Sequence, residues 1–226
     1  MYSLSDVANR RRRSIVNLQK DKSYRRGKTQ MNMQKDAKSS SLYTYVAILV
    51  VLILLNTILA RFGVIARPIG LGCSGLYFSV AFMIAFALWF GGWGVIAAYV
   101  GCFIGAGLLG GMPHGVNLYW SLADIWQVLI PLAAFKAFDA DVELKTRRDF
   151  LVFLIFGWLL NNVAGAGWGA SMLAVGGLAS WNDVPGIFAG WLIGNLIVTI
   201  LITPILLRYF TPRIQKAGLL VKQYWA

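Results

Sequence analysis

Six long apolar stretches, separated by short connections, constrain this chain more than any other feature of its sequence. They cover residues 43–61, 76–90, 94–109, 118–135, 150–175 and 185–207. A helix rises about 1.5 Å per residue and a bilayer core is about 30 Å thick, so about 20 apolar residues make one span. Somewhat fewer suffice where Gly-rich helices pack inside protein. The sequence therefore predicts an all-α integral membrane protein with six transmembrane helices.

The distribution of basic residues predicts the orientation of this bundle. Nineteen of the 21 Lys and Arg fall on the side that would hold both termini, in residues 1–42, 136–148 and 208–222. The other side receives only Arg61 and Arg67. Because cytoplasmic loops carry an excess of Lys and Arg, we expect a multi-pass protein of the cell membrane with both termini in the cytoplasm. The net charge of +12 follows from this asymmetry, so we expect the lipid bilayer and no nucleic acid as a partner.

The composition divides the chain into three parts. Residues 1–42 contain the run Arg10–Arg13 and few apolar side chains, so they cannot bury enough surface to fold alone. We expect a disordered cytoplasmic tail that contacts anionic lipid, and the alternative is a docking arm for a cytoplasmic partner. Residues 43–210 are the predicted membrane domain and residues 211–226 a short basic cytoplasmic tail. The short connection at residues 91–94 predicts an antiparallel hairpin of the second and third helices.

The predicted fourth helix carries the one acidic residue that lies well inside a span. Placing an ionised Asp at the bilayer centre costs about 2.5–3.5 kcal/mol, so such a residue normally faces the bundle and has a partner. Trp120, Asp124 and Gln127 recur at helical spacing and therefore share one helix face. Asp124 is either a ligand contact or counter-ion, or a helix-initiating residue with a structural hydrogen bond.

Polar residues also follow one face of the fifth and sixth helices. Amides within a bilayer must find partners across helices, whereas small residues four apart, such as Gly101 with Gly105 and Gly165 with Gly169, are usually packing devices. Three Trp-bearing or amide-bearing faces predict a common interior pocket for a small organic ligand. The predicted binding residues are Trp120, Asp124, Gln127, Asn161, Asn162, Trp191 and Asn195.

The sequence offers little for catalysis or metal binding. His114 has no Cys, His or carboxylate at metal-ligand spacing, and Cys73 and Cys102 fit neither a CxxC motif nor a disulfide framework. Ser171 lies in a Gly-rich stretch but has no intramembrane base near it in the sequence. No phosphate-binding Gly loop is present, so we expect no ATP hydrolysis by this chain. We expect no catalytic residues, no metal, no cofactor and no enzyme activity.

Three segments carry a resemblance to known families. They are the hairpin at residues 75–94, the segment 121–129 around Asp124, and the last helix at residues 191–207, which is the closest match. Residues 75–207 resemble the six-helix fold shared by substrate-binding S-components of energy-coupling-factor vitamin transporters and by MASE1-type membrane sensor domains. The last helix is similar to MASE1 in particular. The resemblance implies a six-helix bundle that binds a small molecule.

Three functions follow as expectations. The first is a subunit that binds a small organic nutrient for uptake and is energised by a separate ATPase module, which the lack of an output domain favours. The second is a MASE1-like sensory or regulatory module with a signalling partner, which Gly194-Asn195 and Thr203-Pro204 of the last helix favour. The third is a structural membrane protein without a ligand.

Overall fold

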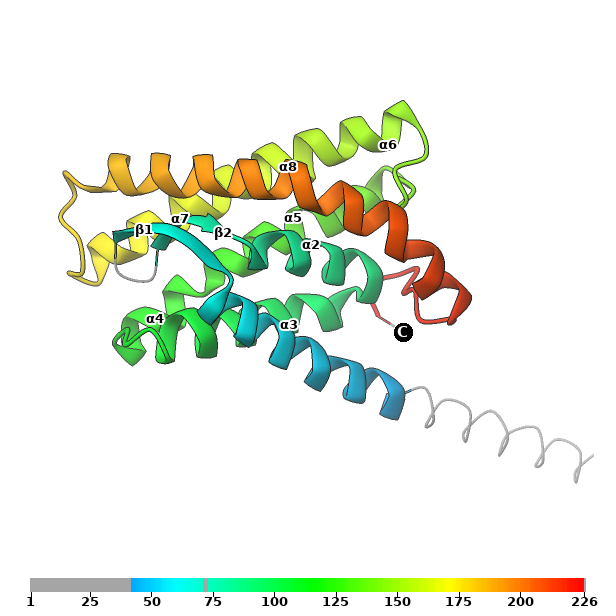
Figure 1. Ribbon diagram of the computed structural model, residues 1–226, viewed down its shortest axis with the longest axis horizontal. Helices are drawn as coiled ribbons and strands as arrows, with labels where there is room; N and C mark the ends of the chain where they lie inside the picture. Colours follow the sequence, from blue (N-terminus) through cyan, green and yellow to red (C-terminus); the bar gives the residue numbers. More distant parts are fainter. Residues whose placement is uncertain (1–41, 71–72, 226) are drawn as a thin grey trace, which may run out of the picture. The chain divides into compact units, whose positions relative to one another are not determined.

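A computed structural model describes residues 42–70 and 73–225. The prediction of a disordered tail concerns residues that, except for Leu42, lie outside the described residues. Residues Tyr45–Ala226 form one compact unit. Its elements, shown in Figure 1, are the helix Leu42–Phe62, β1 (Val64–Gly70), β2 (Cys73–Tyr77), α2 (Ser79–Phe90), α3 (Gly92–Cys102), the π-helical segment η1 (Phe103–Leu108), α4 (His114–Trp120), α5 (Leu122–Ala137), α6 (Arg147–Val152), the π-helical segment η2 (Phe153–Leu160), α7 (Asn161–Val175) and α8 (Val184–Lys216).

The described chain is helical, and its apolar helices follow the six predicted stretches. Four helices are long and apolar enough to cross a membrane: Leu42–Phe62, His114–Ala137, Arg147–Val175 and Val184–Lys216. Two apolar helices are shorter: Ser79–Phe90 and Gly92–Leu108. This is the pattern of a multi-pass membrane protein, although two of the six predicted spans are shorter than a full crossing.

The start of the second predicted helix differs most from the prediction. We expected a helix from Leu76, but Leu76 and Tyr77 end strand β2, which pairs antiparallel with β1, and α2 begins only at Ser79. The strand packs against α8, where a Cβ on Gly194 would overlap the carbonyl oxygen of Gly75. The predicted all-α class holds for the helical bundle, but the short two-stranded hairpin of β1 and β2 was not predicted. Apolar residues indicate that a segment is buried, but they do not distinguish a buried strand from a buried helix. Here the segment is extended, and its backbone lies directly against α8.

Helix α2 is a buried helix rather than a lipid-facing one. Eleven of its 12 residues are buried, and it packs against α3, α5 and α8. In Figure 1 it lies between α8 and α3. The turn to α3 consists of Gly91 alone, at φ 61°, so the predicted tight antiparallel hairpin is confirmed. Because protein surrounds α2, it does not need the length of a helix that crosses lipid alone.

The small residues of the third predicted helix are packing devices, as expected. A Cβ on Gly101 would overlap the side chain of Asn56 in the helix Leu42–Phe62. At Gly105 a Cβ would lie 2.5 Å from the carbonyl oxygen of Thr57. These two glycines let the helix Leu42–Phe62 pack closely on α3 and η1.

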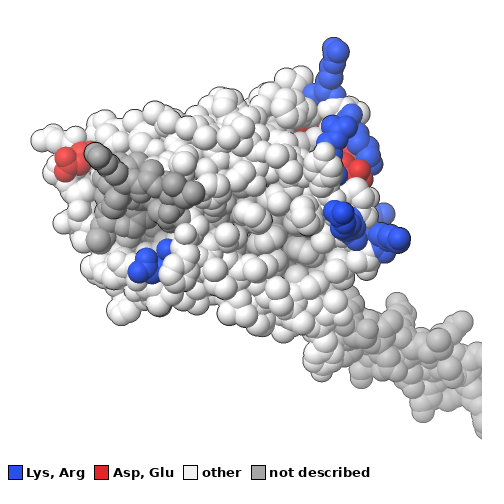
Figure 2. Space-filling model, in the orientation of Figure 1, with Lys and Arg blue, Asp and Glu red and all other residues white. Residues whose placement is uncertain are grey.

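Charged side chains gather at the ends of the unit. Figure 2 shows Lys and Arg concentrated where α8 ends and α6 begins, a region that we call the basic end. Its residues are Lys136, Lys145, Arg147, Arg148, Arg208, Arg213, Lys216 and Lys222. Arg61 lies at the opposite end, since the following Gly63 is hydrogen-bonded to Phe78 at the start of α2. Between the ends the surface exposes large apolar side chains, such as Leu54 and Leu201, as a lipid-facing belt requires.

The predicted orientation can be tested by labelling single cysteines from one side of the membrane. A cysteine at Asn182, exposed in the loop between α7 and α8, should react with an impermeant maleimide in intact cells, because that loop lies at the end opposite to the basic end. A cysteine at Lys145, in the basic end, should react only after permeabilisation. The unsubstituted protein gives the background of Cys73 and Cys102. If the cysteine at position 182 reacted only after permeabilisation, the predicted orientation would be wrong, and both termini would lie outside the cytoplasm.

Candidate functional site

The seven predicted binding residues all lie in the protein interior. None of them is more than 6% exposed, and they come from α4, α5, α7 and α8: Trp120, Asp124, Gln127, Asn161, Asn162, Trp191 and Asn195. The prediction that Trp120, Asp124 and Gln127 share an interior face is confirmed, although Ser121 separates α4 from α5 between them. Six of these residues form three groups, and the seventh, Asn195, lies one helical turn from Trp191 of the first group.

The first group is an aromatic pair. The rings of Trp120 in α4 and Trp191 in α8 lie 5.6 Å apart at an interplanar angle of 51°. Gly169 of α7 allows this approach, since a Cβ there would overlap the Trp191 ring. The indole nitrogen of Trp120 is buried and has no hydrogen-bond partner among the described residues. This group is therefore an apolar surface with one unpaired hydrogen-bond donor, the Trp120 indole N–H.

The second group surrounds Asp124 in the first turn of α5. The Tyr77 hydroxyl of β2 donates to Asp124 Oδ2 over 3.3 Å. No Lys, Arg or His side chain that the structure describes forms an ion pair with it. Asp124 therefore has a structural hydrogen bond and a favourable place at a helix N-terminus. Its role as a ligand contact stays a prediction.

The third group connects α5, α7 and α8 through amides. Gln127 Nε2 donates to Asn162 Oδ1 at 2.9 Å, and Asn162 Nδ2 donates to Thr199 Oγ1 at 3.3 Å and to the Trp158 carbonyl at 2.7 Å. Asn161 Nδ2 donates to the Gln127 carbonyl at 3.2 Å. Gly165 is necessary here, because a Cβ would overlap the Gln127 side chain. The predicted cross-helix pairing of amides is confirmed.

Several buried polar atoms near these groups have no hydrogen-bond partner among the described residues. They are Trp120 Nε1, Gln127 Oε1, Asn161 Oδ1, Thr203 Oγ1 and both side-chain polar atoms of Asn195. Asn195 lies one helical turn from Trp191 and one from Thr199, so it belongs between the aromatic pair and the amide group. Unpaired polar groups in an apolar interior cost several kcal/mol each. Neither of the two described cavities is lined by any of the seven predicted residues, so the predicted common interior pocket stays a prediction.

The sequence did not reveal the hydrogen bonds that join the Asp124 region to its neighbours. Ser121 Oγ donates to Asn117 Oδ1 at 2.8 Å, and Asn117 Nδ2 donates to the Phe103 carbonyl at 2.9 Å. Phe103 begins η1, where the wider π-helical turn alters the backbone pairing and leaves carbonyls to other donors. Tyr77 was missed because Leu76 and Tyr77, the end of β2, were assigned to the second predicted helix. The Gly-rich run with Gly70, Gly72 and Gly75 is a turn signal that could have suggested the hairpin, whereas no sequence signal marks the π-helical turn.

Nothing in the described residues suggests a metal centre, since no three His, Cys, Asp or Glu side chains gather in one place.

Comparison of the chain with protein-family profiles, with curated proteins and with solved structures finds no match. What the chain and its fold show is a helical protein with several long apolar helices and a buried polar interior.

Proposed function

We propose that this chain is the membrane-embedded, small-molecule-binding subunit of a nutrient uptake transporter, similar to an S-component and energised by a separate ATPase module. One observation supports it above others: a carboxylate without a described cationic partner lies between an aromatic pair and amides whose polar atoms are partly unpaired. A bundle that needed only stability would pack this region with apolar side chains.

The chemistry of the unpaired atoms indicates the class of ligand. Gln127 Oε1, Asn161 Oδ1 and Asn195 Oδ1 are acceptors without a described partner in the same interior as the Asp124 carboxylate, whereas Trp120 Nε1 and Asn195 Nδ2 are the amide or indole donors without one. Trp rings bind flat rings by stacking and cations through their faces. A small organic amine or a protonated heterocycle would supply hydrogen-bond donors for the free acceptors, a positive charge for Asp124 and a flat surface for the Trp rings.

A binding experiment tests this function. A thermal-shift screen of the purified protein against amines, nucleobases and vitamins should find a compound that stabilises it. Asp124→Asn keeps the shape and the Tyr77 contact but removes the charge. Because hydrogen bonds to charged groups contribute about 1.5–3 kcal/mol, we expect roughly a 10- to 150-fold loss of affinity.

The matched control is Asp183→Asn, which removes an exposed carboxylate from the loop before α8. The Ser180 hydroxyl donates to Asp183 at 2.7 Å and keeps the pKa of that carboxyl below its usual value, so this acid is charged at neutral pH. Its replacement should leave the affinity unchanged. If the same compound stabilised the wild-type and Asp124→Asn proteins equally, Asp124 would not be a ligand contact, and its role would be structural.

Sensing is the second candidate, and α8 favours it. The helix that carries Trp191 and Asn195 continues to Lys216 in the basic end, so a shift at the interior can reach the predicted cytoplasmic face. Accumulation of the ligand against its gradient, abolished by ATP depletion, would support transport. Binding without accumulation would support sensing. If no compound binds, the third possibility of a structural membrane protein replaces both.

A further inference from the structure

Residues 219–225, which we call the latch, follow α8 and turn back onto the bundle. Helix α8 ends at Lys216, and Gly218 at φ 70° reverses the chain. The sequence predicts a short basic tail here. The latch instead crosses the α2–α3 turn and the end of α5, and Val221 is only 3% exposed. It is thus an ordered part of the basic end.

The latch pairs with backbone groups that helices leave free at their ends. Val221 N–H donates to the Trp89 carbonyl at 2.8 Å, in the last turn of α2. The Tyr224 carbonyl accepts from Gly92 N–H, the first residue of α3, at 2.7 Å. Terminal carbonyls of one helix and terminal N–H groups of the next have no intrahelical partners. The latch therefore caps both helices of the hairpin at once.

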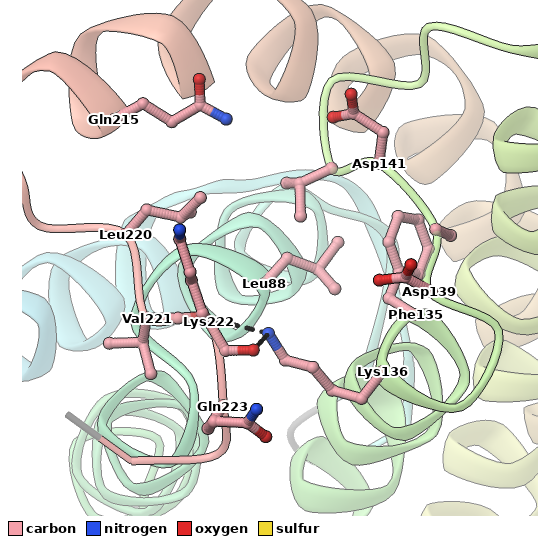
Figure 3. Close-up of a pocket in the computed structure, with 12 residues that line it drawn as sticks. Leu88, Phe135, Lys136, Asp139, Asp141, Gln215, Leu220, Val221, Lys222 and Gln223 are labelled. Atoms are coloured by element: carbon pink, nitrogen blue, oxygen red, sulfur yellow. Dashed lines mark hydrogen bonds between the residues drawn. The ribbon is translucent and has the colours of Figure 1, made fainter.

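One lysine joins the latch to α5. Lys136 Nζ, in the last turn of α5, donates to the Val221 carbonyl at 3.1 Å and to the Lys222 carbonyl at 2.9 Å. Figure 3 shows the Lys136 side chain reaching across the pocket to these carbonyls. The pocket has a volume of about 380 Å³, and Asp139, Asp141 and Gln215 also line it. It leaves open space beside the latch.

The remaining contacts of the latch are modest. The Trp225 ring packs edge-on against Trp93 with centroids 5.5 Å apart, and the Tyr45 hydroxyl donates to the Leu219 carbonyl at 3.4 Å. Tyr224 and Trp225 are 42% and 55% exposed. Val221 is buried, and Leu219 and Leu220 pack against the main core. Opening of the latch would therefore expose these three apolar side chains, but it would leave the helices of the core in place.

We propose that the latch couples the interior polar groups to the basic end by locking α5 to α8. Helix α5 carries Asp124 and Gln127 at one end and Lys136 at the other. Helix α8 carries Trp191 and Asn195 and continues into the latch. A change in the spacing of α5 and α8 at the interior therefore alters the distance that Lys136 must bridge. Where the change in spacing is caused by a ligand, this coupling rests on the proposed function. A ligand that draws α5 and α8 together then slows the opening of the latch.

Hydrogen–deuterium exchange of the full chain in detergent tests the latch without any ligand. Lys136→Met removes two charge-assisted hydrogen bonds, so we expect exchange in residues 219–225 to rise at least about tenfold. Lys222→Met removes a charge from the same pocket but keeps the backbone carbonyl that accepts from Lys136, and it should change exchange less than about twofold. Exchange in α2 should stay slow in both variants. Equal exchange rates of residues 219–225 in the wild type, Lys136→Met and Lys222→Met would show that Lys136 does not hold the latch.

A second pair of variants tests the coupling. Asn162→Ala breaks the link from Gln127 to Thr199, which connects α5 and α8 far from the latch, and it should speed exchange in residues 219–225. Asn161→Ala breaks only a bond to α5 and should have less effect. If Lys136→Met opens the latch but Asn162→Ala does not, the coupling is wrong. A failed ligand screen would contradict the proposed function alone, because neither pair of variants needs a ligand.

Discussion

Gly194→Ala is expected to lower the free energy of unfolding by about 2–3 kcal/mol, or to displace β2 from the bundle. A Cβ at this position would overlap the carbonyl oxygen of Gly75, and both partners are backbone. A flexible side chain could move aside, whereas here the strand or the helix must shift. The intrinsic gain of about 1 kcal/mol from replacing Gly by Ala within a helix does not offset that displacement. Unfolding by SDS or by heat in detergent measures the effect.

Gly186→Ala is the matched control, because it makes the same substitution in the same helix. A Cβ at Gly186 meets no atom within 4 Å, so this variant should be as stable as the wild type or up to about 1 kcal/mol more stable. Equal unfolding midpoints for Gly194→Ala and Gly186→Ala would contradict the close packing of β2 on α8. If only Gly194→Ala is destabilised, the hairpin is an integral part of the bundle.

Asn162→Ala is expected to cost about 2–3 kcal/mol of stability. Its side chain makes three hydrogen bonds, with Gln127, Thr199 and the Trp158 carbonyl. A cross-helix hydrogen bond in a membrane protein contributes about 0.6 kcal/mol on average, and a buried partner that is left unpaired adds about 1–3 kcal/mol. The loss should appear as a lower SDS concentration at the unfolding midpoint.

The neighbouring Asn161 provides the comparison for this effect. Asn161→Ala removes one described hydrogen bond, to the Gln127 carbonyl, and leaves an oxygen that already has no described partner. We therefore expect a loss of about 1 kcal/mol, smaller than for Asn162→Ala. If a ligand uses the free oxygen, Asn161→Ala should weaken binding more than it weakens the fold. Equal destabilisation by the two substitutions would contradict the amide network as described.

Apart from the start of α2, the sequence alone determined the helical segments, the interior face of Trp120, Asp124 and Gln127, and the packing role of glycines such as Gly101 and Gly165. Each of these depends on hydrophobicity or spacing along one element, which is a local property. The separation of basic residues between the two ends is likewise readable without a structure, because it depends only on the order of charged and apolar segments.

Tertiary structure alone decided how these elements meet. The hairpin that brings Tyr77 to Asp124, the π-helical turn that Asn117 caps, and the latch held by Lys136 all join residues distant in sequence. Such contacts depend on how backbones fit beside one another, and a one-residue change of register would exchange their partners. Periodicity identifies which side chains must be buried in a membrane bundle. Only the packing of the elements determines which polar groups become paired, and which remain free in the interior.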